Sequence, residues 1–328
     1  MRPTGKLHLG NYMGALANWV KLQDQYECYF FIADWHALTT DYADTSQIAP
    51  NTKDVLLDYL AAGLDPEKSV LFLQSRVLQH AELTLLLGMI TPLGWLERVP
   101  SYKEQQENLS SKDLSSIGFL GYPLLQAADI LIYQPQFVPV GHDQAAHVEL
   151  TREVARRFNQ FYKLDGREVL PEPRVLLTPS PKLPGTDGRK MSKSYGNTIL
   201  MTDAERIVRQ KLKTMVTDPA RIRRTDPGDP DICPVGDLHK VFSTPETLAN
   251  VYEGCRSAGI GCLECKGWVA DALVQLLTPI QERRASFTEA QVAEILEDGS
   301  NRARTRAEQT MVEVRNAMRM CSTSADTL

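Results

Sequence analysis

The sequence lacks the features of a membrane or secreted protein. No apolar run among its 328 residues approaches the roughly 18 residues of a membrane span. The opening residues, MRPTGKLHLG, have no apolar core like that of a signal peptide. We therefore expect a cytoplasmic protein that does not engage a membrane.

An excess of positive charge is also missing. The chain has 36 Lys and Arg against 41 Asp and Glu, a net charge of −5, so the whole chain is not a basic nucleic-acid binder. A local patch can still steer an RNA. The basic run 221–224 is a candidate contact with a phosphate backbone, and an ordinary solvated surface is the alternative.

Cysteine is scarce and unevenly placed, because four of the six cysteines fall within residues 233–265. Cys233, Cys255, Cys262 and Cys265 are separated by 21, 6 and 2 residues, and Pro234 follows the first. In a cytosolic protein such clustering favours a metal or cluster site over disulfides. Cysteine followed by proline and a C-x2-C pair are frequent in iron–sulfur ligation. Four thiolates also satisfy tetrahedral zinc, and four unrelated buried thiols are the third possibility.

Strand and helix patterns alternate along the first half of the chain. Apolar runs at 28–33 and 70–74 predict buried parallel strands, and 53–62 between them has helical spacing. Another helix is predicted over 11–22, and a third strand over 137–140 leads into a helix of about 15 residues. This alternation predicts an α/β fold with a Rossmann-type parallel sheet.

The rest of the chain has mostly helical patterns. Residues 78–132 are broken by glycines and prolines, and residues from 203 onward are predicted to be helical to the end. The clearest helix is 302–318, with one apolar stripe. A length of 328 residues suggests about two domains.

Two distant segments suit a triphosphate. Lys190–Ser194 reads KMSKS and follows a Gly- and Pro-rich run, so we expect a loop that offers two cations and two hydroxyl donors. Gly5–Tyr12 opens a helix with a glycine, a histidine and an asparagine, and helix N-termini bind phosphate. A lysine–serine run alone is more often a solvated loop. Only the two segments together indicate a triphosphate site.

This pair resembles the HIGH-like and KMSKS signatures of class I aminoacyl-tRNA synthetases, which clamp ATP from opposite sides. Residues 8–11 stand in the HIGH position, with Asn11 in place of the second histidine. Further segments are similar to tryptophanyl-tRNA synthetases in particular, and tyrosyl-tRNA synthetases share the same plan. These segments are 2–16, 122–133, 138–153, 188–194, 215–221 and 310–318.

The resemblance implies activation of L-tryptophan with ATP and Mg2+, then transfer to tRNA(Trp), by a homodimeric ligase. It implies a Rossmann catalytic domain over 1–200, with a helical insertion at about 78–132 and the KMSKS loop, and an all-helical anticodon-binding domain over 201–328. A subset of the family carries a 4Fe–4S cluster, which here would be held by Cys233, Cys255, Cys262 and Cys265, with Zn2+ as the alternative.

The resemblance also assigns site residues. The catalytic set is His8, Asn11, Lys190 and Lys193. The ATP-binding set is Arg2, Pro3, Thr4, Gly10, Asn11, Gly141, His142, Asp143, Leu183, Lys190, Met191, Ser192, Lys193 and Ser194. The tryptophan-binding set is Asp129, Tyr122, Gln126, His36, Val138, Val140 and Gln144. His142 replaces the family's usual glutamate, which puts the role of that side chain in doubt.

Asp129 is the residue expected to set specificity. An indole offers one N–H donor and no acceptor. A carboxylate at the base of an apolar pocket is its natural partner, and a site built around that bond rejects analogues that lack the donor. The alternative is that Asp129 pairs locally or caps a helix.

Two rival functions and one structural expectation remain. The rivals are an adenylyl- or cytidylyltransferase of the same superfamily and a catalytically weak paralogue.

A Rossmann sheet normally delivers its first phosphate loop from the end of a strand, whereas Arg2–Gly5 begins almost at residue 1. We therefore expect an upstream in-frame segment of about ten residues to belong to the native protein.

Overall fold

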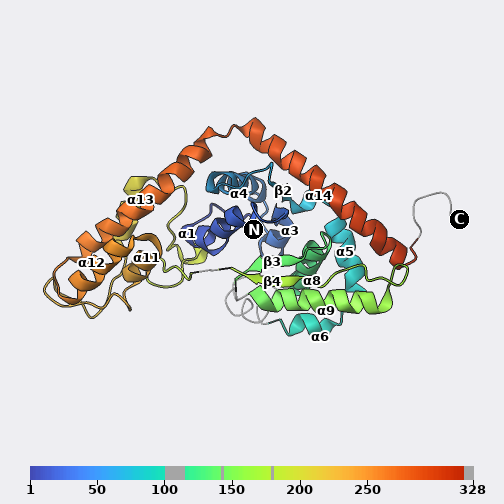
Figure 1. The fold of residues 1–328 in the computed structure, drawn as a ribbon, viewed down its shortest axis with the longest axis horizontal. Helices are drawn as coiled ribbons and strands as arrows, with labels where there is room; N and C mark the ends of the chain where they lie inside the picture. The colour runs from blue at the N-terminus through green and yellow to red at the C-terminus, as the bar shows by residue number, and fades with distance from the viewer. Residues whose placement is uncertain (100–114, 142–143, 179–180, 321–328) are drawn as a thin grey trace.

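The computed structural model describes residues 1–99, 115–141, 144–178 and 181–320, and helices dominate them. Figure 1 shows their arrangement. The strands are β1 (Cys28–Ile32), β2 (Ser69–Leu73), β3 (Phe137–Val140) and β4 (Arg174–Leu177). The helices are α1 (Leu9–Asn11), α2 (Ala17–Leu22), α3 (Asp34–Asp41), α4 (Ile48–Ala62), α5 (Gln79–Gly88), α6 (Leu93–Glu97), α8 (Ile117–Leu131), α9 (Ala145–Phe161), α10 (Glu205–Thr214), α11 (Pro234–Phe242), α12 (Pro245–Arg256), α13 (Cys262–Ser286) and α14 (Glu289–Ala317).

The strands form two parallel pairs. β1 pairs with β2, with Cys28 opposite Ser69, and β3 pairs with β4, with Phe137 opposite Arg174. The predicted strands at 28–33, 70–74 and 137–140 are therefore confirmed, and the pairing is parallel as predicted. β4 was not predicted; Pro173 stands directly before it, and prolines mark loops more often than strands. Among the described residues a cavity of about 620 Å3 lies between the pairs and is lined by residues of β1 and β3.

Met1 lies beside the end of β1. Its amino group donates to the carbonyl of Phe31 at 2.7 Å, and its own carbonyl accepts from the N–H of Ala33 at 2.8 Å. The expectation of an upstream segment stays a prediction.

The predicted helix over 11–22 differs from the observed one in one respect. A π-helical turn, Tyr12–Leu16, separates α1 from α2. Such single wide turns occur inside α-helices and are frequent at functional sites, and periodicity alone cannot reveal them. α4 is longer than predicted at its start, and it ends where Gly63 adopts φ +110°, a conformation that favours glycine.

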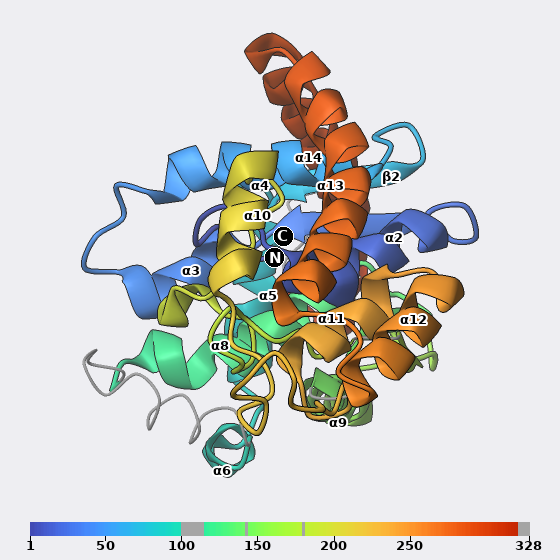
Figure 2. The same ribbon diagram turned by 90° about the vertical axis from the view of Figure 1, so that its left-hand side faces the viewer.

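Two long helices cover the body of the molecule. α13 and α14 form the two arms of a wedge above α4 in Figure 1. α10 packs against α13 in Figure 2. The stripe predicted on 302–318 is confirmed, since Ala303, Ala307, Met311 and Val314 are buried against α5, α8, α9 and β2.

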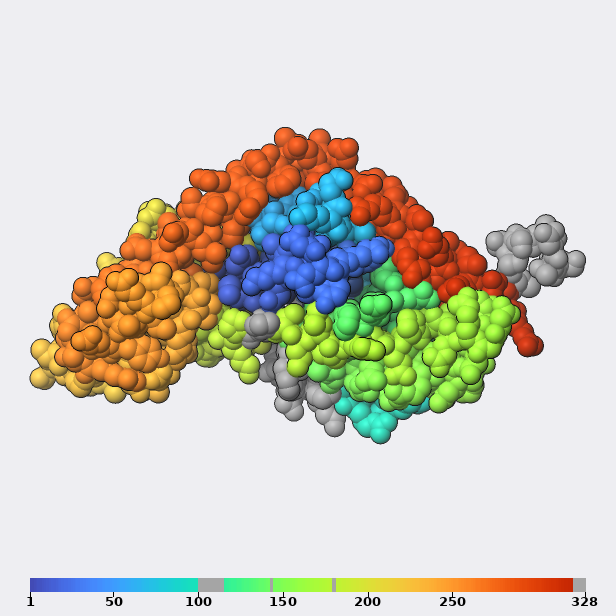
Figure 3. All heavy atoms as spheres, viewed as in Figure 1, coloured from blue at the N-terminus to red at the C-terminus, as the bar shows by residue number. Residues whose placement is uncertain are grey.

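α14 approaches the sheet unusually closely. A Cβ atom on Gly299 would lie 1.9 Å from the carbonyl oxygen of Leu71 in β2, so only glycine fits at this point of the helix. In the space-filling view (Figure 3) the blue N-terminal residues lie in the middle of one face, between the orange helical end and the green residues around α9.

The helical region and the N-terminal half share apolar contacts. One hydrophobic cluster includes Leu7 and Tyr59 from the N-terminal half together with Val269 and Ile280 of α13. The domain division at residue 200 stays a prediction. Within the described residues, every helix is either too short or too polar to span a lipid bilayer.

Candidate active site

A cavity of about 580 Å3 opens where the strands end. It is the place where open α/β sheets bind ligands, beyond the carboxyl ends of the strands. The predicted site residues that line it are Arg2, Gly10, Asn11, His36, Tyr122, Gln126, Asp129, Val140, Gly141 and Gln144. Val138 lines the neighbouring cavity between the strand pairs instead. Residues assigned separately to ATP and to tryptophan thus share one cavity.

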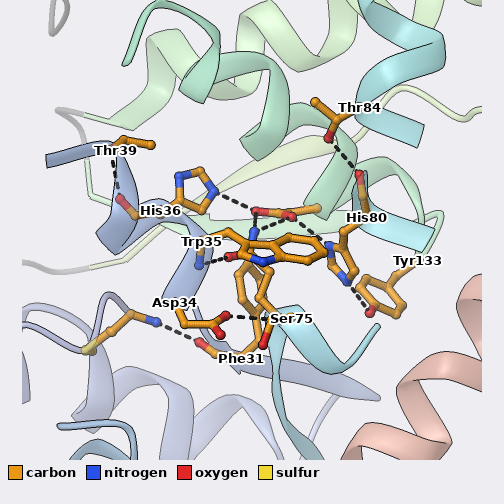
Figure 4. A network of polar contacts seen from close by, with 12 residues as sticks. Phe31, Asp34, Trp35, His36, Thr39, Ser75, His80, Thr84 and Tyr133 are labelled. Atoms are coloured by element: carbon orange, nitrogen blue, oxygen red, sulfur yellow. Dashed lines mark hydrogen bonds and ion pairs between the residues drawn. The ribbon is translucent and has the colours of Figure 1, made fainter. Parts of the chain in front are cut away.

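Asp129 is the centre of a buried hydrogen-bond network, and Figure 4 labels His36, His80 and Tyr133 among its members. One carboxylate oxygen lies 2.7 Å from Nε2 of His36, and the other lies 2.6 Å from Nδ1 of His80. The side-chain amide of Gln74 donates to both oxygens, at 2.8 and 2.9 Å. His80 in turn lies 2.7 Å from the hydroxyl of Tyr133 through Nε2. The carboxylate is therefore fixed in position from three sides.

The network also fixes the charge of Asp129. Burial alone would raise the pKa of this carboxyl, but hydrogen bonds from His36 and His80 outweigh burial and hold the pKa well below its usual range. Asp129 is therefore a carboxylate at neutral pH, and it is only 2% exposed. A buried fixed anion of this kind binds an N–H donor strongly and rejects ligands that leave it unpaired.

Sequence analysis missed three members of this network: Gln74, His80 and Tyr133. Gln74 directly follows β2, as Asp34 follows β1, so the rule that ligands meet strand ends could have found it. Tyr133 stands four residues after Asp129, on the same face of α8 and its continuation. His80 lies in a helix that carries no motif, and only the folded chain brings it to Asp129.

The two phosphate motifs lie against each other. Nζ of Lys193 donates to the carbonyl of Gly5 at 2.6 Å. The chain after KMSKS adds backbone bonds from Met201 to Leu7 at 2.9 Å and from Leu9 to Ile199 at 3.0 Å. The two segments, almost 190 residues apart in sequence, are therefore in direct contact, and their clamping of ATP stays a prediction. The KMSKS residues lie on a loop as predicted, with one short 3-10 turn over 193–195.

Burial also sets the charges of this clamp. It lowers the pKa of His8 to about 4, with a smaller contribution from the nearby Lys193. His8 is therefore neutral at pH 7, and its buried Nδ1 meets no hydrogen-bond partner within the described residues. Burial lowers the pKa of Lys193 to about 8, although Asp58 opposes the shift. Lys193 remains mostly cationic at neutral pH.

Asn11 has a structural role as well as a predicted catalytic one. Its side-chain oxygen accepts from the N–H of His8 at 3.1 Å. Gly10 stands next to His8, and a Cβ atom there would lie 2.8 Å from the imidazole. A glycine here would let an adenine ring approach the backbone, and it also leaves the room that the His8 imidazole occupies.

The other predicted ATP residues lie around the clamp and do not line the cavity. Pro3, Leu183 and Met191 are buried, Ser192 is half-buried, and Thr4, Lys190 and Ser194 are exposed. Asn197 orders the loop by accepting from the N–H of Ser192 at 2.8 Å. The predicted residues His142 and Asp143 lie outside the described residues.

The four predicted metal ligands lie at helix ends. Cys233 precedes α11, Cys255 lies in the last turn of α12, and Cys262 and Cys265 lie in the first turn of α13. They are free thiols, and Cys265 interacts electrostatically with the other three. No set of three or more His, Cys, Asp and Glu side chains in the described part of the chain is arranged to hold a metal ion. The structure thus does not show the predicted metal site.

Two buried cations accompany these thiols. Nη1 of Arg221 lies 3.6 Å from Sγ of Cys255, and the guanidinium also donates to the carbonyls of Arg224 and Ile260. Lys266 donates to two backbone carbonyls, and its charge interacts with three of the thiols. The proposal of a phosphate contact at 221–224 is corrected for Arg221, which is buried because it packs against Cys255.

Comparisons with known proteins agree with this geometry. The family model described as class I tRNA synthetases (W and Y) matches residues 1–278. The tryptophan–tRNA ligase of Thermotoga maritima is 53% identical and covers 98% of each chain. That of Ralstonia nicotianae is 49% identical and covers 97% of this chain and 96% of its own. The crystal structure of Campylobacter jejuni tryptophanyl-tRNA synthetase complexed with ADP and tryptophan has a TM-score of 0.86 at 32% identity, covering 98% of each chain.

Proposed function

This chain belongs to the class I tryptophanyl-tRNA synthetases, and from that membership we propose which residues carry each step. The enzyme activates L-tryptophan with ATP to tryptophanyl-adenylate and transfers the amino acid to tRNA(Trp). The observation that carries the residue assignment is the fixed carboxylate of Asp129 in the wall of the cavity at the strand ends.

Tryptophan binds with its indole N–H donating to Asp129. His36 holds one oxygen of this carboxylate, His80 holds the other and Gln74 donates to both, so the acceptor does not need to reorganise when the ligand arrives. Tyr122, Gln126, Val138, Val140 and Gln144 complete the tryptophan site. Phenylalanine has no ring donor and cannot form this bond, and tyrosine carries its only ring donor, the hydroxyl, at the tip of a single ring and not on the edge of an indole.

The protein supplies position and charge for adenylate formation. The tryptophan carboxylate attacks the α-phosphate and pyrophosphate leaves, so no protein nucleophile is required. His8, Asn11 and the cationic Lys190 and Lys193 stabilise the developing charge on the phosphates, which Mg2+ also screens. Lys193 exchanges its contact with Gly5 for a phosphate oxygen.

The remaining described residues of the proposed ATP site lie in the cavity wall or around the contact between Lys193 and Gly5. Gly10 and Gly141 lie in the cavity wall, where backbone can approach the adenosine. The set around the clamp is Arg2, Pro3, Thr4, Leu183, Met191, Ser192 and Ser194, with His142 and Asp143 outside the described residues.

Pyrophosphate exchange with each of the twenty amino acids tests this proposal. We expect exchange with tryptophan alone. Asp129→Asn should raise the KM for tryptophan at least tenfold, because a charged acceptor in a dry site is worth about 1.5–3 kcal/mol. Lys193→Ala should mainly lower kcat and serves as the contrast. Equal activation of tyrosine by the unmodified enzyme would sink the assignment.

We also propose that Cys233, Cys255, Cys262 and Cys265 hold a 4Fe–4S cluster, with zinc as the alternative. The surroundings fit an anionic centre. Arg221 and Lys266 are buried cations that contact backbone carbonyls and one thiol, and buried cations need a compensating anion. Gly228 leaves space beside Cys255, where a Cβ atom would lie 2.8 Å from Sγ. Such a centre would cross-link the ends of α11, α12 and α13.

Metal content decides between the alternatives. Protein purified without oxygen should be brown and contain about four irons per chain if the cluster forms. A quadruple Cys→Ser variant should lose both the iron and the colour. Stoichiometric zinc with no iron would establish the alternative. Protein that contains neither iron nor zinc would refute both proposals.

We further propose a homodimer formed through the helices of the predicted insertion. Leu78, Leu85 and Met89 lie on one face of α5, spaced by seven and four residues, and all three are exposed. Leu93 and Ile117 add to the exposed apolar surface of the same region, and Ile117 is 90% exposed. Exposed apolar clusters on a folded domain favour an interface, and a second copy offers the same surface around a two-fold axis.

A further inference from the structure

A second buried carboxylate, Asp58, lies outside the lining of the cavity at the strand ends. It belongs to α4 and is fully buried. Oδ2 accepts from the backbone N–H of Leu7 at 3.0 Å, and Oδ1 accepts from Nε of Arg284 at 2.9 Å. Burial raises the pKa of Asp58, while these two bonds favour the charged form. A buried carboxylate is tolerated only with such partners, so its position depends on both of them.

The backbone N–H group that donates to Asp58 is that of Leu7, which lies in the segment 5–11 assigned to the phosphates of ATP. Leu7 stands between Gly5, which accepts from Lys193, and His8, which begins α1. The carbonyl of Leu7 accepts from Met201 on the opposite side. Asp58 is therefore one of the contacts that set where His8 and the following N–H groups point.

Arg284 connects this loop to the helical region. Its Nη2 donates to Asp54 at 2.5 Å, which holds the guanidinium in place beside Asp58. α13 has 25 residues and is thus about 37 Å long. The cysteines lie at its first turn and Arg284 at its last. One continuous helix therefore joins the cysteine region to the backbone of the phosphate loop.

We propose that Arg284 and Asp58 are positioning residues for ATP, and that through them α13 couples the helical region to the nucleotide site. The inference rests on the proposed role of residues 5–11 in ATP binding. Arg284 fixes Asp58, Asp58 fixes Leu7, and the loop then presents His8 and its N–H groups to the phosphates. Neither side chain lines the cavity that contains Asp129, so the effect is expected on ATP and not on tryptophan.

Pyrophosphate exchange kinetics test this coupling. Arg284→Met should raise the KM for ATP about tenfold, within the range of measured couplings between sites, and leave the KM for tryptophan unchanged. Asp58→Asn keeps an oxygen for Leu7 but loses the charge, and it should act on ATP in the same way. The double variant should be no worse than the stronger single variant, because both changes break one chain of contacts.

Arg283→Met is the matched control. Arg283 is the neighbouring residue of α13 and also contacts α4, but through the carbonyl of Ala61 at 2.8 Å and not through Asp58. It should leave both KM values unchanged even if it lowers the melting temperature. Arg284→Lys, which keeps the charge, gives a milder variant if Arg284→Met does not fold, and the same selective effect on ATP is expected.

Three outcomes separate the possibilities. A selective rise in the KM for ATP supports the coupling. Unchanged kinetics, or equal changes for ATP and tryptophan in both arginine variants, would mean that the Arg284–Asp58 contact only packs the helices. That result would overturn the coupling. His8→Ala examines the underlying assignment: if that variant impairs ATP use while Arg284→Met does not, the proposed function stands and the coupling fails.

Discussion

His8 shows how one buried residue changes the pH response of the protein. Its pKa is about 4 in the folded chain, against 6.5 for an exposed imidazole, mainly because of burial. Between these values the unfolded chain binds a proton that the folded chain does not. The contribution of His8 to stability is therefore complete above pH 6.5 and is lost as the pH falls toward 4.

We expect the free energy of unfolding of the unmodified protein to fall more steeply on acidification than that of His8→Gln. Denaturant unfolding at several pH values between about 4 and 7 measures this difference. Glutamine has no charge in this range, and the other titrating groups are common to both proteins. Parallel curves for the two proteins would contradict the assigned shift.

At the same scale, the sequence predicted some site residues and not others for a clear reason. His36, Tyr122, Gln126 and Asp129 were found from their motifs and do share a cavity. Asp129 was expected to accept from an indole, with a local partner or a helix cap as the alternative, whereas His80 reaches it from another helix at 2.6 Å. A contact between elements 49 residues apart has no signature in either segment.

Elements were predicted best where one strong periodic pattern decides them. The runs at 28–33 and 70–74 gave β1 and β2, because strands covered on both faces are continuously apolar. The apolar stripe on 302–318 predicted the second half of α14. The helix begins earlier, at a capping box formed by Thr288 and Gln291. The π-helical turn at 12–16 has the same apolar spacing as an α-helix, so the sequence does not reveal it, and Pro173 hid β4 by marking its segment as a loop.

The helical region was predicted less well than its individual helices. Residues from 203 onward were expected to be helical to the end, yet those between α10 and α11 form turns and loops. These loops bring Arg221 and Gly228 to Cys255. The spacing of the cysteines indicated a shared site but could not indicate the cations buried beside it.

For the whole molecule, the proposed dimer makes a direct prediction. A charge introduced at Leu85 would be buried without a partner in the interface, which costs several kcal/mol. Sedimentation should therefore give the mass of two chains for the unmodified protein and of one chain for Leu85→Glu. Val312→Glu, on an exposed position of α14, should remain a dimer. A dimeric Leu85→Glu would place the interface elsewhere.

The close approach of Gly299 to Leu71 has a consequence for biosynthesis. At that carbonyl the helix backbone leaves no room for another strand, so α14 protects β2 from pairing with a second molecule. The ribosome releases β1 and β2 long before residue 299 leaves the exit tunnel. During that interval the nascent sheet is exposed to pairing with other chains, and the last helix to be made is the one that ends the exposure.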